Sequence, residues 1–347
     1  MKGEDPPAPG SPTATLRDLG ERGLIERVRR RLPAPGPAVL VGIGDDAAAI
    51  AWPDGQILLL TTDTLIEGVH FRRATSTLRD VGAKALAVNV SDIAAMGGEP
   101  RFALLALACP PDCGVADIDE LYAGILEMAG RHGVELIGGD TCATPERMVL
   151  TLTLVGGLAG VPLTRRGARP GDAILVTGTL GASAAGLASL EHGRSRLEPA
   201  AAAEIQSAHR RPTPRVAEGR IIRASGAATA MIDVSDGLAT DLAHVAEESG
   251  VGARVRLAAL PVSEATREAA RALDQAAWAW AVSGGEDYEL LFTAAPERAV
   301  ALAARITTET GTPVSRIGEI RPAAEGVAFL DEAGRAVDVR AGFEHFR

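Results

Sequence analysis

The chain has 347 residues, which is enough for two domains of ordinary size. Its 35 basic and 45 acidic residues give a net charge of −10 without a basic stripe, so nucleic acid is not expected as a partner. No run approaches the roughly 18 apolar residues that a membrane span needs, and three cysteines are too few for a disulfide scaffold. We therefore expect a cytoplasmic protein with no membrane segment.

The first half of the chain alternates between strand and helix patterns. Residues 1–13 are rich in Pro and Gly, which predicts a disordered leader. A helix through Leu24, Ile25 and Val28 is expected next. The expected strands are 39–43, 57–61, 102–109, 134–137 and 148–155, and the expected helices are 83–96 and 118–131. This alternation favours an α/β or α+β fold.

A turn-rich segment, residues 156–172, predicts the boundary between two domains, because Gly and Pro accumulate there. The first domain is expected to span residues 14–158 and the second residues 159–347. The second half restarts with a strand and a small-residue helix that begins at Ala182. The expected strands are 174–177, 230–234, 253–257, 288–293 and 314–317, and further helices are expected at 214–224, 237–249, 263–273 and 296–309.

Acidic residues recur beside Gly, Ser or Thr, mostly just after apolar strands. The five places are GIGDD (42–46), TTDT (61–64), NVSD (89–92), GGDT (138–141) and DVSDG (233–237). One Asp in such a place usually caps a turn or a helix. Five such places favour convergence on a cation, because neighbouring carboxylates repel one another unless a positive charge lies between them. Oxygen ligands beside glycine-rich turns indicate Mg²⁺, Mn²⁺ or Ca²⁺, and here a Mg²⁺–nucleotide site.

Other motifs leave alternatives open. The P-loop GxxxxGK[ST] and the protein-kinase motifs are absent. The segment SGGEDYELLF (283–292) is either a tight turn into an edge strand or a loop in which Glu286 binds a polar group of a substrate. His70 follows the Asp63 turn and is either a structural hydrogen-bond partner or a ligand contact. The histidines interpreted as surface residues are His132, His192, His209 and His244.

Seven motifs in order make the chain resemble the thiamine-monophosphate kinases, a family within the aminoimidazole-ribonucleotide-synthetase-like ATP-binding superfamily. The motifs are GIGDDAA, TTDTLIEGVHF, AKALAVNVSDIAAMGGEP, LIGGDT, LTRRGARPGD, DVSDGLATDL and SGGEDYELLF. The match runs from about Leu19 to the terminal GFEHF (342–346). The resemblance implies two α/β domains, with the strands of the first domain completing a barrel across a homodimer.

The resemblance also implies a reaction and roles for individual residues. The γ-phosphoryl group of ATP passes in line to thiamine monophosphate, with the help of several Mg²⁺ ions, to give thiamine diphosphate and ADP. The implied metal ligands are Asp46, Thr61, Thr62, Asp63, Asp92, Asp140, Asp233 and Asp236, of which Asp63, Asp92 and Asp236 are also expected to be catalytic. The implied ATP contacts are Tyr122, Gly139, Asp140, Arg165 and Ser235, and the implied thiamine contacts are His70, Glu286 and Phe343.

Two alternatives accompany this interpretation. Within the superfamily, selenophosphate synthetases carry a reactive Cys or selenocysteine near the N-terminus, whereas the first cysteine here is Cys109. The hydrogenase-maturation enzymes end in a cysteine-bearing tail, whereas this chain ends in Phe346-Arg347. A non-catalytic nucleotide- or metal-binding protein is the other alternative. Such a protein is expected to have lost part of the acidic set, and no member of the set is missing.

Overall fold

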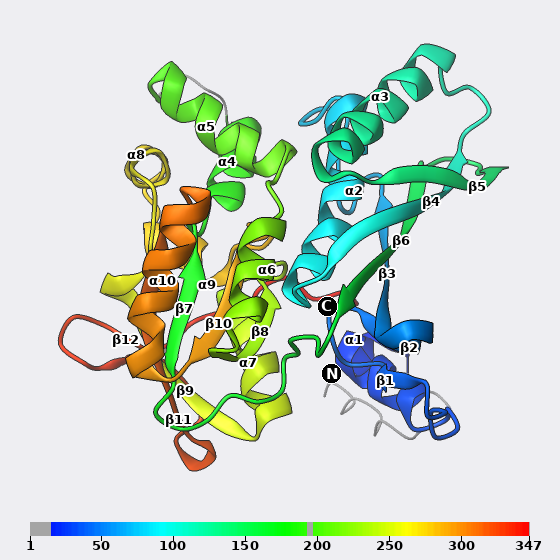
Figure 1. The fold of residues 1–347 in the computed structure, drawn as a ribbon. Coiled ribbons are helices and arrows are strands. Elements are labelled where there is room, and N and C mark those ends of the chain that lie inside the picture. The colour runs from blue at the N-terminus through cyan, green and yellow to red at the C-terminus, as the bar shows by residue number, and fades with distance from the viewer. Residues whose placement is uncertain (1–14, 193–196, 347) are drawn as a thin grey trace, which may run out of the picture.

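The computed structural model describes residues 15–192 and 197–346, which form two α/β domains side by side (Figure 1). The predicted leader, residues 1–13, lies outside the described residues. Among those residues, no helix is both long and apolar enough to span a lipid bilayer.

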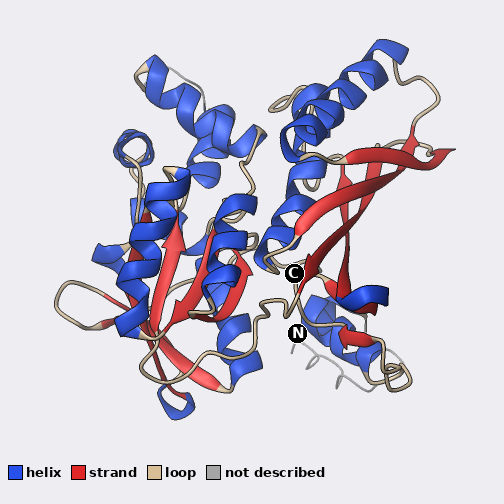
Figure 2. Ribbon diagram, viewed as in Figure 1, coloured by secondary structure: helices blue, strands red, loops and turns tan. Residues whose placement is uncertain are grey.

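The N-terminal domain is a mixed sheet with helices α2 and α3 on one face (Figure 2). Its strand order is β1-β2-β3-β6-β4-β5, in which β4 and β5 are parallel and the other neighbours antiparallel. The elements are α1 (Leu16–Arg29), β1 (Val39–Val41), β2 (Ala48–Trp52), β3 (Gln56–Ile66), α2 (Leu78–Ala95), β4 (Glu99–Cys109), α3 (Val115–His132), β5 (Glu135–Ala143) and β6 (Val149–Ala159).

The C-terminal domain is built around a second sheet of order β13-β12-β9-β11-β7-β10-β8. One face of this sheet packs on α7 and α9, and the other packs on α6 and α10. The elements are β7 (Ala173–Thr177), α4 (Ala182–His192), α5 (Pro199–Arg210), α6 (Val216–Ser225), β8 (Ala228–Asp233), α7 (Leu238–Ser249), β9 (Val251–Arg256), α8 (Glu264–Ala272), α9 (Ala277–Ser283), β10 (Leu290–Ala294), α10 (Pro296–Thr310), β11 (Val314–Pro322), β12 (Val327–Leu330) and β13 (Ala336–Val337).

Helix α2 lies where the two domains meet. All its residues except Arg79 and Asp92 are buried, because the first sheet, α3, α6 and β8 surround it. The approach to α3 is close: a Cβ added to Gly124 of α3 would lie 1.9 Å from the Arg79 carbonyl oxygen of α2. On the other side, a Cβ added to Gly219 of α6 would lie 2.2 Å from the Ala94 carbonyl oxygen. Glycine is therefore required at both crossings.

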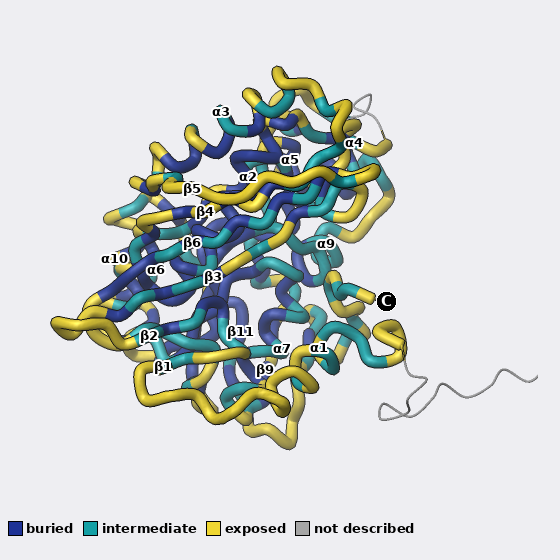
Figure 3. Tube along the Cα trace, turned by 90° about the vertical axis from the view of Figure 1, so that its right-hand side faces the viewer, coloured by how far each residue is buried: buried dark blue, intermediate teal, exposed yellow. Residues whose placement is uncertain are grey.

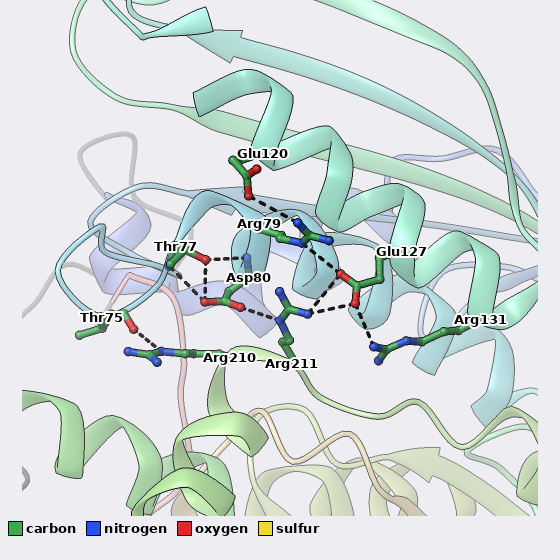
Figure 4. A network of polar contacts seen from close by, with 9 residues as sticks. All are labelled: Thr75, Thr77, Arg79, Asp80, Glu120, Glu127, Arg131, Arg210 and Arg211. Carbon is green, nitrogen blue, oxygen red and sulfur yellow. Dashed lines mark hydrogen bonds and ion pairs between the residues drawn. The ribbon is translucent and has the colours of Figure 1, made fainter. Parts of the chain in front are cut away.

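A network of ion pairs joins the start of α2 and α3 to the segment after α5 (Figure 4). The Arg211 guanidinium donates to Asp80 Oδ1 at 2.6 Å and lies 3.3 Å from Glu127 Oε2. Asp80 also accepts from Thr77, the N-cap residue of α2. The N-terminus of α2 is thus held by groups from both domains.

No helix of the described residues covers the second face of the N-terminal sheet (Figure 3). Phe102 and Leu104 of β4 are 40% and 41% exposed on this face, and Ile137 of β5 is 58% exposed. Strand β5 is the edge of the sheet, and each of its residues except Leu136 is exposed. The domain therefore presents an apolar face and a free strand edge that the described part of the chain leaves uncovered.

The two-domain α/β fold is confirmed, and the expected elements differ from the structure mainly at their ends. Helix α2 begins at Leu78, before the expected residue 83, because Thr77 and Asp80 form a capping box there. Strand β10 begins at Leu290, after the expected residue 288, because Tyr288 takes a left-handed φ of 52° that ends strand geometry. The domain boundary at residue 158 stays a prediction.

Five elements were not expected from the sequence: β2, α5, α9, β12 and β13. The sequence of β2 (AAIAW) and that of α5 (PAAAAEIQSAHR) are dominated by alanine, so apolar periodicity is weak in both. The two last strands have only 4 and 2 residues, too few to show a period. Missing α5 matters for the site, because it carries His209.

We predict that Gly124→Ala destabilises the protein by about 3 kcal/mol, since the added methyl group would force α3 away from α2. Gly130→Ala is the matched control on the same helix, because a Cβ there meets nothing within 4 Å. It should raise the unfolding free energy by up to about 1 kcal/mol through helix propensity. Urea unfolding followed by circular dichroism checks both changes. Equal effects of the two substitutions would contradict the close crossing.

Candidate active site

A cavity of about 630 Å³ lies between the two domains. Its walls come from helices α1, α2, α4 and α5, strand β3, the loops after β3 and β8, the loop before β10, and the C-terminal segment. Seven of the residues that the sequence singled out line this cavity: Asp63, His70, Asp92, Ser235, Asp236, Glu286 and Phe343. The fold therefore collects motifs from both halves of the chain around one space.

Three carboxylates converge beside the cavity. Oxygens of Asp46, Asp92 and Asp233 lie within 4.8 Å of one another, although they come from the turn after β1, from α2 and from the end of β8. Hydroxyl groups fix two of them: Thr61 Oγ1 donates to Asp92 Oδ2 at 2.5 Å, and Ser91 Oγ donates to Asp233 Oδ2 at 2.6 Å. The Asp63 carboxyl of β3 lies beside that of Asp92. This arrangement brings together five of the predicted metal ligands: Asp46, Thr61, Asp63, Asp92 and Asp233.

The carboxylate cluster carries more negative charge than its surroundings neutralise. Burial and the neighbouring acids Asp63, Asp233 and Asp46 raise the pKa of Asp92 well above its usual range. Burial, then the Asp46 charge, raise the pKa of Asp233 to about 8. Burial likewise raises the pKa of Asp236 to about 6. Such shifts are expected where carboxylates face one another without enough cations.

Arg165 is the guanidinium that faces the carboxylate cluster. Its Nη2 and Nε donate to Asp46 Oδ1 at 2.6 and 3.1 Å, and its backbone N–H donates to Asp45 Oδ2 at 3.2 Å. Asp46 Oδ2 is buried and has no hydrogen-bond partner among the described residues. A buried carboxylate oxygen without a partner is costly, so this atom is suited to a ligand that the protein binds.

His70 lies in the cavity as a neutral hydrogen-bond donor. Its Nδ1 accepts from the Ile66 backbone N–H at 3.0 Å, so the proton of the neutral ring is on Nε2. Burial, then the nearby His345, lower the pKa of His70 below its usual value. The ring is therefore poorly suited to act as a base, because its one lone pair is already engaged.

Glu286 is held at the opposite end of the cavity by two groups that sequence reasoning missed. Lys84 Nζ donates to Glu286 Oε1 at 2.7 Å, and His209 Nδ1 lies 3.3 Å from Oε2. Burial alone would raise the pKa of Glu286, but the Lys84 ammonium and His209 outweigh it and lower the pKa to about 2. The prediction that His209 is a surface residue is wrong, since the residue is 4% exposed.

Of these two groups, only Lys84 carried a signal in the sequence. Lys84 is one of two lysines in the chain, and it stands in an otherwise apolar, small-residue helix where a charge needs a reason. His209 offered no such signal, because α5 itself was not predicted.

The C-terminal segment closes one side of the cavity. The Phe343 backbone N–H donates to the Asp236 carbonyl oxygen at 3.1 Å, and the His345 backbone N–H donates to Glu21 Oε2 at 3.1 Å. The Phe343 and His345 rings meet edge to face with centroids 4.8 Å apart. Residues near both ends of the chain therefore contribute to the same wall.

Not every predicted site residue faces the cavity. The Thr62 side chain lies on the other face of β3 from Thr61, where its hydroxyl pairs with Thr153 Oγ1 at 3.1 Å. Tyr122 lies on α3, packed against the core of the N-terminal domain, and is not among the residues that line the cavity.

Gly139 and Asp140 lie on β5, three strands from Asp63. Strand pairing places Asp63 opposite Leu152, Leu152 opposite Leu105, and Leu105 opposite Gly139. Three strand spacings amount to roughly 14 Å. Asp140 pairs with Ala106, which like Leu104 is on the exposed face of the sheet, so the described part of this chain does not bring the Asp140 side chain to the carboxylate cluster.

Comparison with known proteins identifies the family. Residues 44–158 match the N-terminal domain of AIR synthase related proteins, and residues 169–331 match the C-terminal domain. The thiamine-monophosphate kinase of Escherichia coli (strain K12) is 39% identical over 328 residues, which covers 94% of this chain and 98% of that protein.

Solved structures agree with this match. The AaThiL structure, complexed with AMPPCP and TMP, has a TM-score of 0.84 and 35% identity, and the match covers 96% of this chain and 100% of that one. The thiamine-monophosphate kinase of Stenotrophomonas maltophilia K279a has a TM-score of 0.74 and 40% identity over 92% of this chain and 98% of its own. This chain therefore belongs to the thiamine-monophosphate kinase family.

Proposed function

We propose that this protein transfers the γ-phosphoryl group of ATP to thiamine monophosphate, giving thiamine diphosphate and ADP by direct in-line transfer. The observation that carries the proposal is one cavity with two chemically different ends. Asp63 and Asp92 line one end, next to the rest of the carboxylate cluster, and the ion pair of Glu286 with Lys84 lines the other. An acceptor that bears a phosphate at one end and polar rings at the other fits this division.

The carboxylates of the cluster fit divalent cations, and we infer that several Mg²⁺ ions bind here. The donor set is entirely oxygen, as Mg²⁺ prefers, and Asp46 Oδ2 is a buried oxygen that lacks a partner among the described residues. Asp46, Asp63, Asp92 and Asp233 would hold the ions, with Asp236 at the cavity side. When bound, Mg²⁺ would supply positive charge against the phosphates and the carboxylates together.

Protein side chains then have to position two anions rather than to remove a proton. A phosphate monoester oxygen is already anionic near neutral pH, so the acceptor needs no base. The His70 Nδ1 lone pair accepts from the Ile66 backbone N–H, and Nε2, which lies 3.4 Å from His345 Nε2, is the nitrogen left to contact the acceptor. We expect the Arg165 guanidinium, which pairs with Asp46, to contact a phosphate of ATP, together with Ser235, which lines the cavity.

We predict that thiamine monophosphate is a substrate and that free thiamine is not. Free thiamine offers a hydroxyl group, which needs a base, and His70, the histidine expected to contact the acceptor, is engaged at Nδ1. The test supplies ATP, Mg²⁺ and either acceptor, and separates the thiamine species by chromatography. Comparable consumption of free thiamine would refute both the substrate and the base-free transfer.

A second prediction concerns the metal. The folded-state pKa values of Asp233 and Asp92 are raised, so the metal-free protein should lose stability as pH rises through about 8. Above pH 7 the histidines, whose pKa is near 6.5 in an unfolded chain, are largely neutral in both states and contribute little. The thermal midpoint in chelator should fall between pH 7 and 8.5, and Mg²⁺ should restore it.

Asp92→Asn is the matched variant for this measurement. It removes one repelling charge, so its metal-free form should be more stable at pH 8.5 than the wild type, and its turnover should be nearly abolished. The metal assignment would be contradicted if the thermal midpoint of the wild type rose with pH in chelator and did not change on addition of Mg²⁺.

We also propose that the protein is a homodimer formed through the exposed face and edge of the N-terminal sheet. Two features support an interface between sheets. The face exposes the apolar side chains of Phe102, Leu104 and Ile137, and the edge of β5 is free. The predicted ATP contacts Gly139 and Asp140 lie on this edge, away from their own carboxylate cluster. A partner's β5 would therefore supply them to the site across the interface.

Sedimentation at micromolar concentration should show a dimer. Ile137→Asp should dissociate this dimer, whereas Val300→Asp, at an exposed position of α10, should leave it intact. A mixture of inactive Asp63→Asn and Asp140→Asn subunits then tests contribution across the interface. Half of the randomly formed dimers are mixed, and each has one complete site, so about a quarter of the wild-type rate should return. No recovery would place Asp140 in its own subunit's site or outside both sites.

A further inference from the structure

Three side chains on one stripe of α2 line the cavity: Lys84, Val88 and Asp92. Steps of four residues keep the side chains on one face of a helix and advance about 6 Å each. Asp92 belongs to the carboxylate cluster, so Lys84 marks a second polar end of the same cavity, about 12 Å away along the helix. Val88 provides an apolar surface between the two ends.

The Lys84 ammonium is buried and has hydrogen-bonding capacity left over. The residue is 4% exposed, and within the described part of the chain its Nζ has one hydrogen bond, to Glu286 Oε1. An ammonium has three N–H donors, and a buried donor without a partner is costly. Because Lys84 lines the cavity, a bound molecule there can accept from the remaining donors.

Neighbouring groups hold the Glu286 carboxylate in position and fix its backbone in an unfavourable conformation. Its carboxylate lies between Lys84 and His209, and His209 Nδ1 also lies 3.1 Å from Ser183 Oγ. Its backbone N–H donates to the Ser235 carbonyl oxygen at 2.6 Å, and its φ of 64° is in the left-handed region that favours glycine. Backbone strain of this kind persists only where neighbouring groups fix the conformation.

We propose that Lys84 is a positioning and specificity-determining residue of the acceptor site. With His209 it holds the Glu286 carboxylate in place, and together Lys84 and Glu286 recognise a neutral heterocycle that carries an amino group beside a ring nitrogen. The amino group donates to Glu286, and the ring nitrogen accepts from Lys84 Nζ. This inference rests on the proposed function, in which the aminopyrimidine of thiamine monophosphate is such a ring.

The charges at this end favour the neutral ring over the cationic thiazolium ring. The Lys84 and Glu286 charges cancel, so a cationic ring would gain little attraction there, and the ammonium would repel it. The carboxylate end of the cavity carries the excess negative charge. The thiazolium ring therefore belongs nearer to Asp63 and Asp236, and the pyrimidine ring nearer to Lys84.

The first experiment is Lys84→Met in the full-length protein. We expect the KM for thiamine monophosphate to rise about tenfold or more, as the loss of a charged hydrogen bond implies, while the KM for ATP stays within about twofold. Arg211→Met is the matched control. It breaks the ion pair with Asp80, one turn before Lys84 on α2, outside this cavity, and should change neither KM.

The second experiment changes the acceptor. An analogue of thiamine monophosphate with an oxo group in place of the pyrimidine amino group should have a kcat/KM about tenfold to a hundredfold lower with the wild type. In Lys84→Met, the ratio of kcat/KM between the two acceptors should fall to a few fold. A purely structural role of Lys84 would not alter this discrimination.

Several results would overturn the inference. Equal use of the two acceptors by the wild type would do so without any variant, even if Lys84→Met failed to fold. Unchanged KM values in Lys84→Met, or equal increases for ATP and acceptor, would also overturn it. If the wild type did not phosphorylate thiamine monophosphate at all, the proposed function itself would fail. Normal turnover with the wrong KM pattern would refute the role of Lys84 alone.

Discussion

The burial of α2 between two domains is the constraint on which the rest of the structure depends. A helix enclosed on every side needs small residues wherever another backbone approaches, which is why glycines stand at its crossings with α3 and α6. Most polar side chains on such a helix are then buried or half-buried as well and need partners. Lys84, Ser91 and Asp92 find theirs in groups from other elements, so the same packing that joins the domains also builds the cavity.

The two ends of the cavity differ in their balance of charge. At the cluster end, Asp46, Asp92 and Asp233 approach one another with Arg165 as the facing guanidinium, and the excess negative charge suits ligands that bring cations. At the other end, Lys84 neutralises Glu286, and the pair offers one acceptor and spare donors of nearly balanced charge. A substrate is thereby oriented by charge at one end and by hydrogen-bond pattern at the other.

The N-terminal sheet adds a third element to this division. Its inner face packs on α2, whereas its outer face and its β5 edge expose apolar side chains together with Gly139 and Asp140. Exposure of an apolar sheet face to water costs free energy. Association with a second sheet would remove that cost by burying the face. In such an association, the exposed motif on β5 of one subunit would complete the site formed by the carboxylate cluster of the other.

The alternating α/β fold, the family and most of the acidic residues could be predicted from the sequence, because apolar periodicity and the order of motifs can be recognised along the chain without knowledge of its packing. The sequence also placed His70, Glu286 and Phe343 together, through their resemblance to one family. The face on which each side chain lies, and the groups that it contacts, depend on the three-dimensional packing and could not be predicted in this way. A shift of one residue along β3 separates Thr61 from Thr62, and three strand spacings separate Asp63 from Gly139. The partnership of Lys84 with Glu286 joins positions 202 residues apart, and contacts of that range depend on packing, not on local pattern.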